Sequence, residues 1–262
     1  MEKIKVSIVI PVYNSFEILD ELNQRILRSL KNVNLSECFE LIMINDFSKD
    51  KSWDKIKYLS SKYNYIKGIN LSDNFGQHNA IMAGLNNCKG EYVITIDDDL
   101  QHPPEFFPEI IKKLLNYDVC YTNYRNRKHN FWKKIVSKIN NIVSSFLLNK
   151  PLNIYLSSYR GLKREVVLDI IKFNKPNVYI DGIIIRATKN IGIIAIDHDE
   201  RKSGKSNYDL RKLFILWSNM IIDLKFYPIR ISSIFGFILK FFVVLLRKKK
   251  VKPQYEILEQ IP

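Results

Sequence analysis

Three consecutive aspartates, Asp97, Asp98 and Asp99, place the strongest constraint on how this chain folds. They directly follow residues 92–96, a short run of β-branched, aromatic and apolar residues that is typical of a strand buried on both faces. Carboxylates this close together repel one another, and their burial costs free energy unless a cation neutralises them. A divalent cation bound through carboxylate and amide oxygens would do so. A solvated acidic turn is the alternative for any isolated Asp-x-Asp, but the buried strand favours a metal site.

The spacing of the polar residues indicates which side chains would share the ion. In an extended segment, residues two apart point in the same direction, so Asp97 and Asp99 can converge on one cation, with Gln101 next in that series. Pro103 and Pro104 then predict the end of the extended segment and the start of a helix. The segment therefore predicts an oxygen-rich cation site at the end of a strand.

The first part of the chain alternates between strand-like and helix-like segments. We expect buried strands at residues 6–10, 41–44, 66–71 and 92–96, with amphipathic helices between them. This alternation predicts a doubly wound, mostly parallel α/β sheet with right-handed crossovers, whose ligand lies outside the carboxyl ends of the strands. The polar clusters expected at those ends are residues 11–14, Asp46, residues 73–74 and residues 97–101. No Gly-x-Gly-x-x-Gly or Walker motif occurs, which disfavours a dinucleotide dehydrogenase or a P-loop enzyme.

The second half of the chain has a different pattern. We expect a fifth strand at residues 117–122, a helix at 164–172 and another apolar strand at 191–196. Residues 125–148 have the pattern of an amphipathic helix with a basic face, which suits either an ordinary surface helix or a helix on a membrane. The loop at residues 201–208 combines basic, hydroxyl and glycine residues before a helix, a combination that suits a phosphate group.

The net charge of +14 narrows the choice of partners. Such an excess suits phosphorylated small molecules, an anionic membrane face or nucleic acid. No RNA-binding signature or zinc-finger spacing occurs, so we expect no nucleic-acid partner. Residues 231–246 are mostly apolar, but a helix of about 24 Å is shorter than the roughly 30 Å of a hydrocarbon core. This favours a helix in the plane of the membrane interface.

Five motifs occur in an order that resembles family 2 glycosyltransferases of the GT-A fold. They lie at residues 7–14, 45–50, 71–78, 97–105 and 201–208. The last two resemble the polyprenyl-phosphate branch, which includes dolichyl-phosphate mannose synthase and bactoprenol glycosyltransferases. The resemblance implies a Rossmann-like GT-A domain over residues 1–225 and a membrane-associated helix with a basic tail over residues 226–262. Relatives commonly carry two carboxyl-terminal membrane spans, so whether this chain crosses the membrane stays open.

The resemblance also implies roles for individual residues. Nucleotide-sugar binding would fall to Pro11, Tyr13, Asn14, Asp46 and Asp97. Mg²⁺ or Mn²⁺ on the donor diphosphate would be held by Asp97, Asp99 and Gln101. The acceptor phosphate would be bound by Arg127, Lys134, Arg201, Ser206 and Tyr208, and the catalytic residues would be Asp98, Asp99 and Arg201. The chain departs from the family at Phe47, where Gly is common, and at Asp73, where Arg is common.

The implied activity is an inverting, metal-dependent transfer of a sugar from a nucleotide sugar to a polyprenyl (undecaprenyl-type) phosphate at the cytoplasmic face of the cell membrane. A lipid phosphate is already an anionic nucleophile, so this reaction needs no strong general base. The alternative acceptor is a saccharide hydroxyl on a lipid-linked glycan for an O-antigen or capsule, which would need a base such as Asp98 or Asp181. For Asp98 we favour support of the metal loop. A non-catalytic membrane scaffold is a further alternative, and a homo-oligomer is possible.

Overall fold

Strands and helices alternate along the first part of the chain, as the hydrophobic pattern predicts. The structure is a computed structural model that describes residues 4–124, 141, 144–145, 148, 150–176, 178–196 and 253–262. The first elements in chain order are β1 (Val6–Val12), α1 (Leu19–Lys31), β2 (Phe39–Asn45), α2 (Ser52–Lys62), β3 (Ile66–Leu71), α3 (Gln77–Asn87) and β4 (Tyr92–Thr95).

The elements after β4 are mostly shorter. The two prolines open a 3₁₀ turn, η1 (Pro104–Phe106), which leads into α4 (Phe107–Leu114), as their sequence predicts. The remaining elements are β5 (Val119–Tyr124), β6 (Arg160–Lys163), α6 (Arg164–Ile171), α7 (Ile180–Ala187), β7 (Ile191–Ile196) and β8 (Ile257–Ile261). Two of these strands, β6 and β8, were not expected from the sequence.

The described strands form one mixed sheet in the order β7-β5-β6-β4-β1-β2-β3-β8. Parallel pairs join β1 to β2 and β4, β2 to β3, and β5 to β7. The strand β6 runs antiparallel between β4 and β5, and β8 runs antiparallel along β3. The prediction of a mostly parallel α/β sheet is therefore confirmed.

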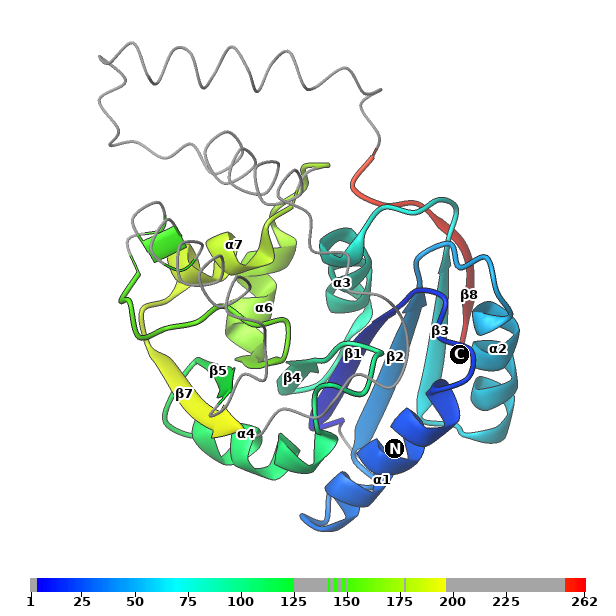
Figure 1. The fold of residues 1–262 in the computed structure, drawn as a ribbon, viewed down its shortest axis with the longest axis horizontal. Helices are drawn as coiled ribbons and strands as arrows, with labels where there is room; N and C mark the ends of the chain where they lie inside the picture. Colours follow the sequence, from blue (N-terminus) through cyan, green and yellow to red (C-terminus); the bar gives the residue numbers. More distant parts are fainter. Residues whose placement is uncertain are drawn as a thin grey trace, which may run out of the picture.

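The chain changes direction across the sheet at β1. From β1 it moves outward to β2 and β3, and α3 then carries it back to β4 on the other side of β1 (Figure 1). In open α/β sheets, the loops at the carboxyl ends of the two strands that flank such a switch diverge and leave a crevice for a ligand. The loops that follow β1 and β4 carry Tyr13, Asn14 and residues 97–101 of the predicted site, and Asp46 follows β2.

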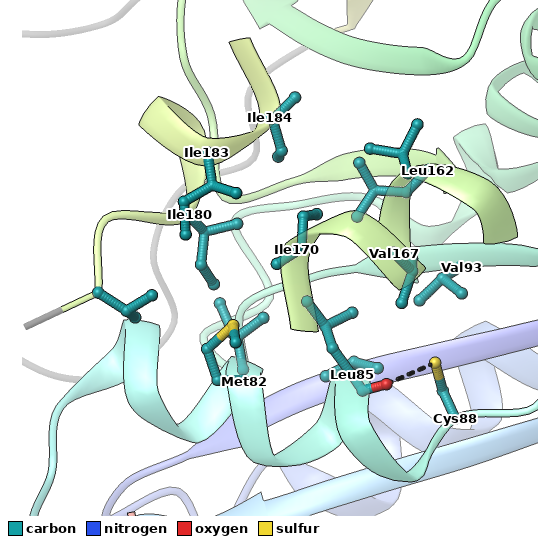
Figure 2. Packing of buried hydrophobic residues seen from close by; sticks show 14 of the residues in the cluster. Met82, Leu85, Cys88, Val93, Leu162, Val167, Ile170, Ile180, Ile183 and Ile184 are labelled. Atoms are coloured by element: carbon teal, nitrogen blue, oxygen red, sulfur yellow. Dashed lines mark hydrogen bonds between the residues drawn. The ribbon is translucent and has the colours of Figure 1, made fainter. Parts of the chain in front are cut away.

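Hydrophobic residues fill both faces of the sheet. On one face, α3, α6 and α7 pack against the strands through residues such as Met82, Leu85, Val167 and Ile184 (Figure 2). The helices α1, α2 and α4 cover the other face. Each fully buried apolar side chain of this size contributes about 1.5–3 kcal/mol to folding. The two cores hold the parallel strands in register and so fix the positions of the loops at their ends.

The end of the chain pairs with the sheet that the first part of the chain forms. We expected residues 226–262 to form a membrane-associated segment with a basic tail, but residues 257–261 form β8 at the edge of the sheet beside β3 (Figure 1). The Trp53 Nε1 donates a hydrogen bond to Glu259 Oε2 at 2.9 Å, and Gln254 Nε2 donates to the carbonyl of Phe173. The last ten residues therefore belong to the sheet domain.

Three predicted segments lie wholly outside the described residues: the loop at 201–208, the helix expected after it and the apolar segment at 231–246. Most of the basic helix predicted at 125–148 does as well. Among the residues that the structure does describe, no helix combines the length and the apolar character needed to cross a bilayer.

Candidate active site

An open pocket of about 530 Å³ lies at the carboxyl ends of β1, β2 and β4. Its position is the crevice expected at the switch between β1 and β4. The pocket is lined by Pro11, Val12, Tyr13, Asp46, Asn74, Gly76, Gln77, Asp97, Asp98 and Asp99. The structure thus brings together residues from four separate segments, and five of the predicted nucleotide or metal ligands are among them.

The turn after β1 is braced by the loop after β2. Asn14 has a positive φ of 55°, and its backbone N–H donates to Ser48 Oγ at 3.0 Å. In return, its Oδ1 accepts a hydrogen bond from the Lys49 N–H at 2.7 Å. Asn tolerates this left-handed backbone better than most residues, whereas Phe47, with a φ of 60°, is a strained exception. Asn14 itself lines a neighbouring pocket of about 650 Å³ rather than the main one.

Asp46 holds the loop between β3 and α3 against the pocket. Its Oδ1 accepts a hydrogen bond from the Phe75 N–H at 2.8 Å, and its Oδ2 accepts one from the Gly76 N–H at 2.9 Å. Gly76 has a φ of 84°, a conformation that glycine adopts without the steric cost of a Cβ. The nearly buried carboxylate of Asp46 therefore shapes the wall of the pocket from which Asn74 and Gly76 face the interior.

Asp98 is turned toward the turn after β1. Its Oδ2 accepts hydrogen bonds from the Tyr13 N–H at 2.9 Å and from Ser15 Oγ at 2.5 Å. The pKa of this carboxyl is raised to about 7. Burial is the main cause, the charges of Asp97 and Asp99 add to the rise, and the two hydrogen bonds oppose it. These contacts tie the loop after β4 to the turn after β1, which is the supporting role that we favoured for Asp98.

Asp97 is held by donors from two other segments. Its Oδ1 accepts a hydrogen bond from Gln77 Nε2 at 2.6 Å, and its Oδ2 accepts one from Ser158 Oγ at 2.7 Å. Its backbone N–H donates to Nδ1 of the buried His102 at 3.4 Å, and that imidazole stacks on Tyr159. His102 therefore supports the loop after β4 as a structural residue.

A hydrogen bond links the backbone of Gln101 to the side chain of Asp99. The Gln101 N–H donates to Asp99 Oδ1 at 3.1 Å across Leu100, which has a φ of 60° and a fully buried side chain. Gln101 is not among the residues that line the pocket, although Asp97 and Asp99 are.

The donor set suits a hard divalent cation. Asp97 and Asp99 present carboxylates to the same pocket, and Mg²⁺ and Mn²⁺ prefer oxygen ligands. Within the part of the chain that the structure describes, no three acidic, imidazole or thiol groups gather into a complete metal site. Mg²⁺ characteristically takes one or two protein carboxylates and completes its shell with substrate phosphates and water. Two carboxylates in a pocket open to a ligand fit that pattern.

A buried polar cluster lies behind the pocket. Arg160, which is 1% exposed, forms an ion pair with Asp181, and the Tyr121 hydroxyl donates to Asp181 Oδ1 at 2.8 Å. Burial raises the pKa of Tyr121 well above its usual value, so this phenol stays protonated and acts as a donor. Because Asp181 already accepts from both neighbours, it has the surroundings of a structural carboxylate.

Several predicted site residues lie outside the described residues: Arg127, Lys134, Arg201, Ser206 and Tyr208. Gln77 and Ser158, whose side chains donate hydrogen bonds to Asp97, received no role from the sequence. Gln77 could have been suspected because it begins the helix that follows the third strand. Ser158 carries no local signal, because its place beside Asp97 depends on the pairing of β6 with β4.

The chain matches Glycosyl transferase family 2 over residues 7–171. It is 35% identical over 234 residues to the undecaprenyl-phosphate 4-deoxy-4-formamido-L-arabinose transferase of Photorhabdus laumondii subsp. laumondii. The aligned region covers 88% of this chain and 71% of that protein. The protein of the same name from Shewanella sediminis is 32% identical over 251 residues, covering 92% of this chain and 75% of that protein.

Solved structures share the fold at lower identity. Glucosyl-3-phosphoglycerate synthase from Mycobacterium tuberculosis, in complex with Mn²⁺, UDP and phosphoglyceric acid, has a TM-score of 0.60 and 18% identity, over 83% of this chain and 76% of that one. S. aureus TarS in complex with UDP has a TM-score of 0.55 and 18% identity, over 84% of this chain. This chain spans 66% of the TarS chain. At these identities the likeness concerns the fold.

Proposed function

The chain belongs to glycosyltransferase family 2, and from this premise we propose that it transfers a sugar from a nucleotide diphosphate sugar to a polyprenyl phosphate. The observation that carries the proposal is the pocket at the switch between β1 and β4, where Asp97 and Asp99 lie together. Relatives that are about a third identical over most of the chain are undecaprenyl-phosphate sugar transferases by name, which supports an undecaprenyl-type acceptor.

On the donor side, we assign the nucleotide to the wall formed by Pro11, Tyr13 and Asp46, with Asn14 supporting the turn from behind. The diphosphate would lie next to Asp97 and Asp99, which would hold Mg²⁺ or Mn²⁺, with Gln101 as a further ligand. A structural neighbour solved with Mn²⁺ and UDP supports a divalent cation in this fold. When bound there, the ion would neutralise negative charge that develops on the departing nucleoside diphosphate.

The remaining chemistry falls to the chain's own residues. Asp98 keeps the loop after β4 tied to Tyr13 and Ser15, so that Asp97 and Asp99 stay at the mouth of the pocket. A lipid phosphate attacks the anomeric carbon from the face opposite the leaving group and inverts it, with no proton to remove. We assign the acceptor phosphate to Arg127, Lys134, Arg201, Ser206 and Tyr208, with Arg201 also offsetting charge on the leaving group.

A saccharide hydroxyl as acceptor is less well supported. Such an acceptor would need a general base within reach. Asp98 accepts two hydrogen bonds from the β1 turn, and Asp181 accepts from Arg160 and Tyr121.

A lipid acceptor also implies work at a membrane surface, and we place the enzyme at the cytoplasmic face, where its net charge of +14 would favour anionic lipids.

The decisive experiment supplies radiolabelled nucleotide sugars one at a time, with Mn²⁺ and undecaprenyl phosphate in detergent micelles. We expect label in an acid-labile lipid phosphate for at least one donor, with Asp99→Ala as the inactive control. Label that appears only in alkali-stable glycan when membranes are supplied would overturn the lipid-phosphate acceptor. Failure of every donor to release nucleotide would favour the non-catalytic alternative.

A further inference from the structure

The Asp97 carboxylate is held at both of its oxygens by neutral donors that come from distant parts of the chain. Gln77, the first residue of α3, donates its Nε2 to Oδ1 at 2.6 Å. Ser158, in the turn before β6, donates its hydroxyl to Oδ2 at 2.7 Å. The two contacts act from opposite ends of the carboxylate and so fix its plane as well as its direction.

Ser158 is itself fixed by the sheet. Its carbonyl oxygen accepts a hydrogen bond from the buried Thr95 Oγ1 at 2.5 Å, and Thr95 is the last residue of β4. The guanidinium of Arg160 also donates to Thr95 Oγ1, through Nε at 3.3 Å. Since β6 pairs with β4 from Thr95↔Arg160 onward, the sheet places the Ser158 hydroxyl beside Asp97. The donor is therefore preorganised.

A carboxylate oxygen has two lone pairs, so a single hydrogen bond at each oxygen of Asp97 leaves acceptor capacity for a cation. Neutral donors also leave the negative charge in place, which an Arg or Lys partner would offset. Hydrogen bonds of this kind orient the ligands of metal sites, and removing them typically costs 10–100-fold in metal affinity or activity.

We propose that Ser158 and Gln77 are positioning residues that hold Asp97 in the orientation in which it binds the divalent cation. This inference rests on the proposed function, because it assumes that Asp97 and Asp99 hold the ion. It goes beyond that function by assigning a role to two residues outside the acidic triplet.

Direct titration of Mn²⁺ tests the proposal without turnover. The unbound Mn²⁺ is followed by its electron paramagnetic resonance signal, with the full chain and a fixed concentration of UDP. We expect Ser158→Ala and Gln77→Met to raise the Kd for Mn²⁺ by about 10–100-fold. Ser158→Thr keeps the hydroxyl and should restore binding to within a few-fold of the original protein.

The matched control is Ser157→Ala in the same turn. The Ser157 Oγ accepts hydrogen bonds from the Tyr159 N–H at 3.2 Å and from Thr122 Oγ1 at 3.3 Å, and it has no bond to Asp97. Loss of this hydroxyl should leave the Kd for Mn²⁺ unchanged. Thermal unfolding of every variant shows whether a higher Kd for Mn²⁺ accompanies a loss of fold. If Ser158→Ala loses its fold, the Kd of Ser158→Thr tests the positioning role instead.

The outcomes distinguish a failure of the positioning role from a failure of the metal assignment. If the original protein binds Mn²⁺, Asp99→Ala abolishes binding, and Ser158→Ala binds as tightly as the original protein, the positioning role is overturned and the proposed function stands. Tighter binding by Gln77→Met would also overturn it, since Gln77 would then obstruct the ion. If Asp99→Ala leaves Mn²⁺ binding intact, the metal assignment itself fails.

Discussion

At the scale of single residues, the three aspartates have different surroundings although they are adjacent in sequence. Asp97, Asp98 and Asp99 all line the pocket, but Asp98 also accepts hydrogen bonds from Tyr13 and Ser15 in the turn after β1. A run of three acidic residues thus serves two purposes, ligand binding and attachment of the loop.

This division predicts how Asp98 variants behave. Asp98→Ala leaves the Tyr13 N–H and the Ser15 hydroxyl without their acceptor, which should lower the free energy of unfolding by about 1–3 kcal/mol. Asp98→Asn keeps an acceptor oxygen and should cost less stability and keep activity within about tenfold of the original. Urea unfolding and a transfer assay check both variants. A general base contributes 10²–10⁴-fold, so an Asp98→Asn loss of that size would contradict the supporting role.

At the scale of elements, an ion pair joins the helix after the acidic loop to α1. Arg25 donates through Nε and Nη2 to the two oxygens of Glu105 at 2.9 and 2.8 Å. Burial alone would raise the pKa of Glu105, but the bonds to Arg25 outweigh it and lower this pKa below the usual 4.5. The first turn of the helix that the two prolines begin is thereby fastened to the neighbouring helix.

The lowered pKa of Glu105 sets the sign of a pH effect. A carboxyl whose pKa is depressed by folding contributes its full stability above its unfolded pKa of about 4.5, and that contribution is lost as the pH falls through its lower folded pKa. The Glu105 side chain is 53% exposed, so solvent screening limits the contribution to less than about 1 kcal/mol. Glu105→Gln should therefore destabilise the protein at pH 7 and much less below pH 4. Urea unfolding at both pH values measures this, and Glu105→Gln in an Arg25→Met background should cost almost nothing.

The contact between α3 and the sheet depends on a glycine. A Cβ at Gly84 would lie 2.4 Å from Val9 Cγ1 and 2.8 Å from Ile44 Cδ1, and both neighbours are fully buried. Alanine is favoured over glycine by about 1 kcal/mol in a helix interior, but overpacking a core costs about 1–3 kcal/mol. Since the β-branched Val9 has little freedom to move, we expect Gly84→Ala to lower the free energy of unfolding. Adding Val9→Ala removes the closer of the two clashing methyls. The double variant should therefore lose less free energy of unfolding than the sum of the two single variants.

The sequence predicted the central elements because each carries a complete local signal. The bounds of β3 and β7 were predicted to the residue, because a polar residue ends each apolar run, Ser72 after β3 and Asp197 after β7. The strand β6 has only four residues, with Arg160 and Lys163 at its ends, and it exists because it fits between β4 and β5. Of the predicted site residues, Pro11, Tyr13, Asp46, Asp97 and Asp99 line the pocket, and their roles as ligands stay predictions. The sequence could not predict the Ser158 contact, which depends on a pairing of distant strands.

At the scale of the whole molecule, the last strand in the chain forms an edge of the sheet that the first strands build. The strand β8 covers the outer edge of β3, with Gly68↔Ile261 and Asn70↔Glu259 as register pairs. The Ile261 side chain fills the space above Gly68, where even a Cβ would lie 2.8 Å from its Cγ1. An uncovered edge strand exposes unpaired backbone groups that invite pairing with other chains. The chain end therefore protects the sheet edge.

Removal of residues 253–262 tests this role of the chain end. The β3 amides that pair with β8 would lose their partners, so hydrogen exchange in the peptide covering residues 66–71 should become faster. Exchange in residues 6–12 should stay slow, because β1 lies between β2 and β4 inside the sheet. Mass spectrometry after timed exchange measures both peptides in one sample. Asp97 and Asp99 follow β4, which β1 and β2 separate from β3 and this edge, so Mn²⁺ binding should persist in the shortened chain. If exchange in residues 66–71 is unchanged by the truncation, β8 does not protect the edge, and the return of the chain end to the sheet has no stabilising role.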